Sequence, residues 1–147
     1  MKLVIQRVKE ASLSVDGRLV SQIDGGLAIY VGVEVGDVEQ SATYLATKVS
    51  KLRIFNDENG KMNKSVMDVG GEVLVISQFT LLADTEHGNR PSYSQAEAPE
   101  RANNLYKFFG EELVRAGVKS VKYGVFGADM TINQVNDGPV TIQMERK

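Results

Sequence analysis

The hydrophobic pattern of the chain is clearest in residues 70–82, where a glycine pair is followed by four consecutive apolar residues. The run at 73–76, Val-Leu-Val-Ile, is short, rich in β-branched side chains and bounded by turn residues. Such a run is typical of a strand that is buried on both faces. The polar residues that follow, Ser77, Gln78 and Thr80, are expected either to satisfy local backbone groups or to face a cleft.

Apolar runs alternate with turn signals in the first third of the chain, which predicts a meander of antiparallel strands. In the opening run, Leu3, Ile5 and Arg7 share one face. An Asp-Gly pair between two alternating runs is a strong signal of a tight hairpin. The predicted strands are residues 2–8, 11–15, 18–23 and 27–35, with turns at 16–17 and 24–26.

Helical periodicity appears in two stretches. Residues 38–52 carry apolar side chains at the spacing of one helix face, and Asp37 with Gln40 forms a capping-box pattern at the start. A second amphipathic helix is expected to begin near Pro99, a residue tolerated in the first turn, and to end at Gly117.

The remaining segments complete an α+β domain that spans residues 1–147, with a mainly antiparallel, barrel-like β-sheet core and two main helices. The polar connection at 83–98 is long for a compact domain, and connections of that length are usually functional or mobile. The other expected elements are a short strand at 54–55, a polar loop at 57–64, a strand at 120–124, a turn at 136–139 and a final strand at 140–144.

Composition places the chain among ordinary globular proteins, with 42% hydrophobic and 24% charged residues. It has no cysteine, which fits a reducing compartment, and it shows neither a signal peptide nor a membrane-spanning run. We therefore expect a cytoplasmic protein with no membrane partner. The net charge of -2 argues against binding DNA or a long stretch of RNA, but allows binding to a nucleic-acid terminus.

Few residues in the chain can carry strong acid–base or metal chemistry. With one histidine and no cysteine, a single chain cannot supply three nitrogen or sulfur ligands to zinc, and no phosphate-binding or dinucleotide-binding motif is present, so no cofactor is predicted. A Ser-His-Asp hydrolase would need His87 as its base, and no Gly-x-Ser-x-Gly elbow supports it. Hydroxyls, an amide and backbone N–H groups remain, and such groups can stabilise an oxyanion.

Four motifs, taken in order along essentially the whole chain, resemble the D-aminoacyl-tRNA deacylase family, also called D-tyrosyl-tRNA deacylases. They are MKLVIQRV at residues 1–8, SQFTL at 77–81, GNRPSY at 88–93 and NDGPVT at 136–141. The resemblance implies hydrolysis of the ester that joins a D-amino acid to the 3′-terminal adenosine of tRNA. It also implies a homodimer with active sites at the subunit interface.

The resemblance also assigns a role in chiral selection to Gly138 and Pro139. They would form a Gly-cis-Pro pair that enters the partner's pocket, where its carbonyls face the substrate Cα and exclude L side chains. Achiral glycine would pass, so glycyl-tRNA is a plausible second substrate. Arg7 would support this loop.

Within the SQFTL motif, the resemblance places Ser77, Gln78 and Phe79 in the pocket, with backbone N–H groups near the scissile carbonyl. Thr80 is a poor nucleophile without an adjacent base, which favours hydrolysis assisted by the 2′-hydroxyl of the RNA, with Thr80 as a pocket or positioning residue. In the same family pattern, Phe126 and Met130 would pack around the terminal adenine.

Two other functions remain open from the sequence. A non-catalytic module could use the same pocket to bind a free D-amino acid or a protein partner. A peptidase or esterase could instead use Ser77 or Thr80 with His87 as its base.

Overall fold

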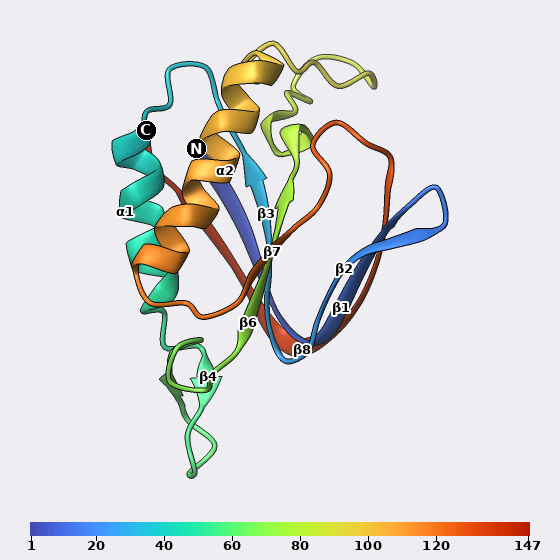
Figure 1. Ribbon diagram of the computed structural model, residues 1–147. Coiled ribbons are helices and arrows are strands. Elements are labelled where there is room, and N and C mark those ends of the chain that lie inside the picture. Colours follow the sequence, from blue (N-terminus) through green and yellow to red (C-terminus); the bar gives the residue numbers. More distant parts are fainter.

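The computed structural model describes residues 1–147 and contains a six-stranded mixed sheet with two helices packed on one side (Figure 1). Two further short strands form a separate hairpin that projects beyond one end of the sheet. The elements are β1 Lys2–Val15, β2 Arg18–Ile23, β3 Gly26–Gly32, α1 Glu39–Ser50, β4 Phe55–Asn56, β5 Met62–Lys64, β6 Glu72–Ser77, the 3₁₀ helix η1 Phe79–Leu82, α2 Pro99–Arg115, β7 Val121–Tyr123 and β8 Met130–Glu145.

The long strand β1 organises the sheet. It pairs with β8 from Lys2 to Val15, while its other edge is shared between β3 and β2. The sheet order is therefore β2-β1-β3-β6-β7, and the predicted meander is wrong because β1 lies between β2 and β3. The β3–β6 and β6–β7 pairs are parallel, which requires the helices as crossover connections.

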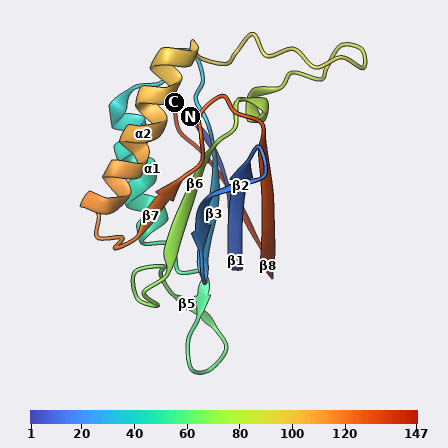
Figure 2. The same cartoon turned by 45° about the vertical axis from the view of Figure 1, so that its right-hand side comes forward.

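The sheet curls into a nearly closed barrel, so the predicted α+β, barrel-like class is confirmed. Its free edge returns toward β7, where the Ser21 hydroxyl donates a hydrogen bond to the Tyr123 carbonyl at 2.6 Å. One apolar cluster fills the barrel and includes Leu13, Leu74 and Ile76. A larger cluster packs the sheet against the helices, which lie together on one side of the sheet (Figure 2).

Strand β6 runs through the centre of this arrangement. All four residues of its apolar run, 73–76, are 0% exposed. Val73 and Val75 face the helices, whereas Leu74 and Ile76 face the barrel interior. Full burial of such a side chain contributes about 1.5–3 kcal/mol, so the strand is a rigid support for the polar residues at its end.

Both helices lie where the periodicity predicts them, but the predicted capping box is wrong. The N-cap of α1 is Val38, and no side chain caps it. The Asp37 carboxylate instead accepts a hydrogen bond from the Glu34 N–H at 2.7 Å and pairs with the buried α-ammonium of Met1. Asp37 thus joins the chain's first residue to the start of α1.

Three local predictions need correction. The polar loop predicted at 57–64 contains β5, and the short strand predicted at 54–55 lies at 55–56. The turn predicted at 136–139 is an irregular part of β8, where the β1–β8 register shifts near Val8. The chain bends but does not reverse there, because β8 continues to pair with β1 on both sides of the irregularity.

The two termini lie beside each other on the helical side of the sheet (Figures 1 and 2). The Arg146 N–H donates to the Met1 carbonyl at 3.0 Å, and the Met1 ammonium donates to the Arg146 carbonyl at 2.7 Å. Neither helix is long and apolar enough to cross a membrane.

Candidate active site

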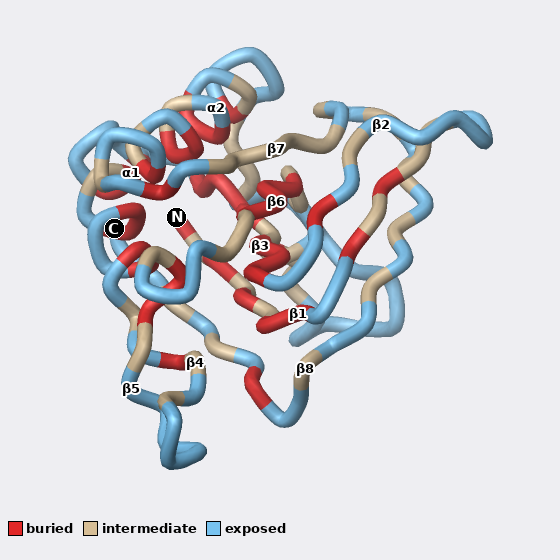
Figure 3. The backbone as a smooth tube through the Cα atoms, turned by 60° about the horizontal axis from the view of Figure 1, so that its bottom comes forward, coloured by how far each residue is buried: buried red, intermediate tan, exposed pale blue.

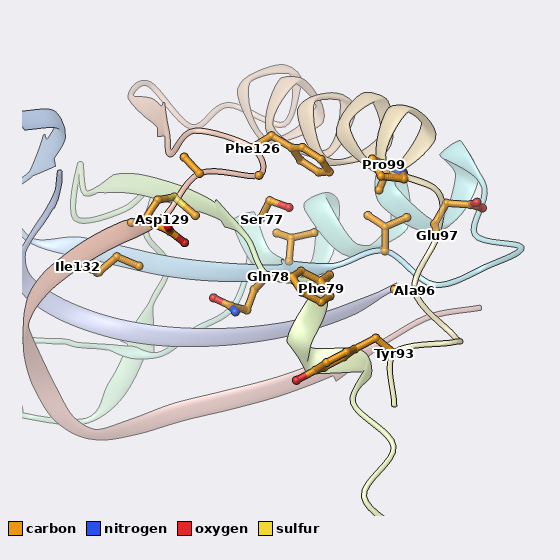
Figure 4. A pocket seen from close by; sticks show the side chains of 16 residues that line it. Ser77, Gln78, Phe79, Tyr93, Ala96, Glu97, Pro99, Phe126, Asp129 and Ile132 are labelled. Atoms are coloured by element: carbon orange, nitrogen blue, oxygen red, sulfur yellow. The ribbon is translucent and has the colours of Figure 1, made fainter. Parts of the chain in front are cut away.

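A pocket of about 630 Å³ opens where β6 ends (Figure 4). Four segments that are distant in sequence form its wall: the end of β3, the end of β6 with the residues after it, the connection that leads into α2, and the chain from the β7–β8 link into the start of β8. The lining residues are Val31, Val33, Ser77, Gln78, Phe79, Tyr93, Ala96, Glu97, Pro99, Ala102, Phe126, Gly127, Ala128, Asp129, Met130 and Ile132.

The change from apolar to polar residues after Ile76 creates one wall of the pocket. The Gln78 N–H donates to the Val31 carbonyl at 2.8 Å, which holds the chain against β3 just beyond the last residue of β6. The 3₁₀ helix then turns the chain away from the sheet. Ser77, Gln78 and Phe79 therefore line the pocket. The strand end predicts this position for the two polar residues, and the family resemblance implies it for Phe79. Their catalytic roles stay predictions.

Thr80 lies outside the lining of the pocket and is exposed. Its hydroxyl accepts a hydrogen bond from the Gln78 amide, and no acidic or basic side chain contacts it. His87 is exposed in the long connection, makes no side-chain hydrogen bond or ion pair, and does not line the pocket. The structure thus gives neither Ser77 nor Thr80 a histidine base.

The opposite wall comes from the segment after β7 and includes Phe126 and Met130. Their contact with the terminal adenine stays a prediction. Behind this wall, the Phe126 ring lies against Tyr106 with a centroid distance of 6.2 Å. The Tyr106 hydroxyl donates to the Val75 carbonyl at 3.0 Å, and burial raises the pKa of this tyrosine well above its ordinary value. Tyr106 is therefore a neutral donor that fixes α2 and this wall against β6.

The long connection contributes residues whose pocket positions sequence reasoning missed. The Tyr93 ring meets Phe79 edge to face, with centroids 5.0 Å apart and planes at 70°. Glu97 also lines the pocket, and its carboxylate accepts hydrogen bonds from the Arg101 guanidinium and the Ala98 N–H, both at 2.8 Å. For Glu97, the only signal in the sequence was the length of the connection, whereas Tyr93 also belongs to the GNRPSY motif at 88–93.

The pocket carries negative charge and no positive charge. Glu97 and Asp129 are its only charged lining residues, and Asp129 has no ion-pair partner. Aromatic and thioether side chains next to carboxylates suit an apolar or stacked group and an ammonium better than a phosphate. No group of three or more histidine, cysteine or acidic side chains is placed to hold a metal ion.

Arg7 is the centre of a second, separate cluster. The side chain is 5% exposed, and its Nε donates to the Asp137 carbonyl at 3.1 Å and lies 3.0 Å from the Asp137 carboxylate. Its Nη1 donates to the Ile54 carbonyl at 2.6 Å and to Asn56 Oδ1 at 3.3 Å. Arg7 thus ties the irregular part of β8 to β1 and to the base of the β4–β5 hairpin.

Gly138 and Pro139 follow directly after this anchor. Both are exposed, the peptide bond between them is cis, and neither lines the pocket. Arg7 is paired with Leu27, which in turn is paired with Val73, four residues before Ser77 on β6. At about 3.3 Å per residue, the two clusters lie about 13 Å apart along the sheet. Within one chain, Gly138 and Pro139 therefore do not reach the pocket that the same chain forms at the end of β6.

The chain is similar to known proteins over its whole length. A family model described as D-Tyr-tRNA(Tyr) deacylase matches residues 4–145. A protein of Bacillus cytotoxicus named D-aminoacyl-tRNA deacylase is 52% identical over 147 residues, covering 100% of both chains. One of the same name from Rhodopirellula baltica is 52% identical over 145 residues, covering 99% of both.

Two solved structures share the fold. One, titled c-Myc DNA Unwinding Element Binding Protein, superposes with a TM-score of 0.93 at 40% identity, covering 100% of this chain and 99% of the other. A probable eukaryotic D-amino acid tRNA deacylase superposes with a TM-score of 0.80 at 15% identity, covering 97% of both chains, and this second likeness concerns the fold alone.

Proposed function

Because this chain belongs to the D-Tyr-tRNA(Tyr) deacylase family and is a D-aminoacyl-tRNA deacylase, a hydrolase, we propose that it proofreads aminoacyl-tRNA in the cytoplasm through the pocket at the end of β6. Water adds to the ester carbonyl, the bond to the terminal ribose oxygen breaks, and a free D-amino acid and tRNA result. Family membership decides against the non-catalytic binding module.

The lining of the pocket supports the aminoacylated 3′ end of tRNA as the bound group. Its volume of about 630 Å³ suits a group of small-molecule size. Phe126 and Met130 offer a surface on which an adenine ring can pack. On the opposite wall, the polar atoms of Ser77 and Gln78 lie near the position proposed for the ester.

The observation that supports RNA-assisted catalysis is that no histidine lines the pocket and that neither the Ser77 nor the Thr80 hydroxyl is hydrogen-bonded to an acidic or basic side chain. Thr80 is outside the lining and His87 is on an exposed loop. A threonine hydroxyl without a base is a weak nucleophile. In our proposal, the 2′-hydroxyl of the terminal adenosine activates the attack, and backbone N–H groups of the SQFTL segment stabilise the developing oxyanion.

We assign chiral selection to Gly138 and Pro139, acting on the pocket of a second copy of the chain. Their exposure and their separation from their own pocket support an action in trans within a homodimer. Rigid backbone carbonyls beside the substrate Cα would collide with an L side chain and accept a D side chain. Glycyl-tRNA lacks a side chain and would also be hydrolysed.

The substitution Gly138→Ala tests the selection step without disturbing the fold. A Cβ at this position meets no atom within 4 Å in the single chain. We expect wild-type urea stability but a strong loss of D-tyrosyl-tRNA hydrolysis, because the added methyl enters the partner's pocket. Wild-type activity in a stable Gly138→Ala protein would contradict the action in trans.

The catalytic proposal has its own test. Thr80→Ala is expected to keep most of the activity on D-tyrosyl-tRNA, whereas a substrate ending in 2′-deoxyadenosine is expected to be stable to the wild-type enzyme. The reverse pattern, an inactive Thr80→Ala with rapid cleavage of the deoxy substrate, would show that catalysis depends on the Thr80 hydroxyl and not on the 2′-hydroxyl of the RNA.

A further inference from the structure

One segment outside the pocket carries a clear excess of basic over acidic residues. Residues 48–64, named here the basic segment, hold five of the 17 basic residues and two of the 19 acidic ones. The segment therefore carries a net charge of +3, and the rest of the chain carries -5. It comprises the last turn of α1, the following link and the β4–β5 hairpin up to Lys64.

Most of these cations are free to meet a partner. Lys48, Lys51 and Lys61 are exposed and form no ion pair. Arg53 is exposed and donates to the Asn63 carbonyl at 3.0 Å and to its side-chain oxygen at 2.8 Å, so no carboxylate neutralises it. Only Lys64 pairs with a carboxylate, that of Glu58.

The hairpin holds its cations on a fixed frame. The Asp57 carboxylate accepts hydrogen bonds from the Asn63 amide at 2.7 Å, the Asn59 N–H at 2.9 Å and the Lys61 N–H at 3.0 Å. The hydrogen bond from Asn63, followed by that from the Lys61 backbone, lowers the pKa of Asp57. This carboxylate is bonded to uncharged donors inside the hairpin, and it forms no ion pair with any of the lysines.

The basic segment is attached to the Gly138-Pro139 pair. Arg7 bonds to the Ile54 carbonyl and Asn56 on one side and to Asp137 on the other. Figure 3 shows β4 and β5 next to the exposed bend of β8 that follows this anchor. When the Gly138-Pro139 pair of one subunit docks on the other subunit, the basic segment of the first subunit is therefore placed beside the docking position.

We propose that the basic segment binds backbone phosphates of the RNA duplex whose aminoacylated end occupies the partner subunit's pocket. This inference rests on the proposed function, in which Gly138 and Pro139 act on the partner. The pocket is lined by no cation, and Arg101 pairs with Glu97 but no cation pairs with Asp129, so the pocket suits the ammonium of the aminoacyl group better than a phosphate. One subunit then supplies the pocket, and the other supplies the phosphate contacts for the attached duplex.

The salt dependence of kcat/KM for D-tyrosyl-tRNA tests this inference. Each phosphate contact contributes about 0.9 to the slope of log affinity against log salt concentration. Lys61→Ala should make the salt dependence less steep, with the magnitude of the slope smaller by about 1. The double variant Lys51→Ala with Lys61→Ala should have a slope smaller in magnitude by about 2. Between about 50 and 200 mM salt, the wild type should then lose about tenfold more kcat/KM than the double variant.

Three controls separate the possible outcomes. Lys107→Ala removes an exposed cation from α2 and should leave the slope unchanged, and Lys61→Arg should preserve it. With D-tyrosyl adenosine, an ester that lacks a duplex, all variants should match the wild type. Equal slopes in the wild type and the double variant, or an equal loss on the adenosine ester, would overturn the inference. Wild-type enzyme that cleaves neither ester would instead refute the proposed function.

Discussion

Replacement of Arg7 by methionine removes the guanidinium that joins β1, β8 and the β4–β5 hairpin, and it retains most of the apolar stem. The Ile54 carbonyl, at 2.6 Å in a buried site, loses a charged donor, which costs about 1.5–3 kcal/mol. The pair with Asp137, whose side chain is 41% exposed, contributes about 1 kcal/mol or less. We expect Arg7→Met to be about 2–4 kcal/mol less stable than the wild type.

Urea unfolding followed by circular dichroism measures this loss. With a slope of about 2 kcal/mol per molar urea, the midpoint should fall by about 1–2 M. Arg53→Met is the matched control, because Arg53 also makes two hydrogen bonds but is exposed, and it should change stability by about 0.5 kcal/mol or less. Equal midpoints for Arg7→Met and the wild type would refute the importance of the buried contacts. The preference for D over L esters should also fall, since the anchor beside Gly138 is lost.

Three further predictions follow from individual contacts. Gly26→Ala should destabilise the protein by about 3 kcal/mol or more in urea unfolding, because its Cβ would lie 1.8 Å from the Glu72 carbonyl oxygen, whereas Gly25→Ala, with its nearest atom at 3.9 Å, should be tolerated. Hydrogen bonds from the Asp24 N–H and the Ser120 hydroxyl lower the pKa of Glu72 in the folded protein. Above its unfolded pKa of about 4.3 the ionised carboxylate therefore stabilises the fold. This stabilisation is lost as the pH falls through the lower, folded pKa. Glu72→Gln should therefore flatten the acid decline of the urea midpoint below about pH 4, and an unchanged decline would contradict this. His87→Ala should leave kcat/KM unchanged, and a drop of about a hundredfold or more would indicate a general base.

The sequence predicts the elements whose local signals agree with their tertiary surroundings. The run at 73–76 is apolar throughout and is buried throughout, and the periodicity of both helices matches the faces that they bury. Local signals failed where a distant partner competed. The Asn-Asp-Gly-Pro segment reads as a turn, but pairing with β1 on both sides keeps it within β8. Asp37 reads as a helix cap, but it pairs with the ammonium of Met1.

In the candidate site too, local sequence patterns predict some residues, and others are placed only by the tertiary fold. Ser77 and Gln78 could be predicted because polar side chains interrupt an apolar run at the end of a strand. Tyr93 and Glu97 reach the pocket through the fold of a long connection. No local pattern marks Glu97, and the GNRPSY motif that contains Tyr93 does not by itself place this residue in the pocket. The 13 Å or so between Gly138 and the pocket also follows only from strand register.

The decisive measurement compares amino-acid release by the wild-type enzyme from D-tyrosyl-tRNA and L-tyrosyl-tRNA under identical conditions. Rapid release from the D ester with an intact L ester is the expected result. Equal rates on both esters would contradict chiral selection at the substrate Cα, and survival of both esters would contradict the deacylase function itself.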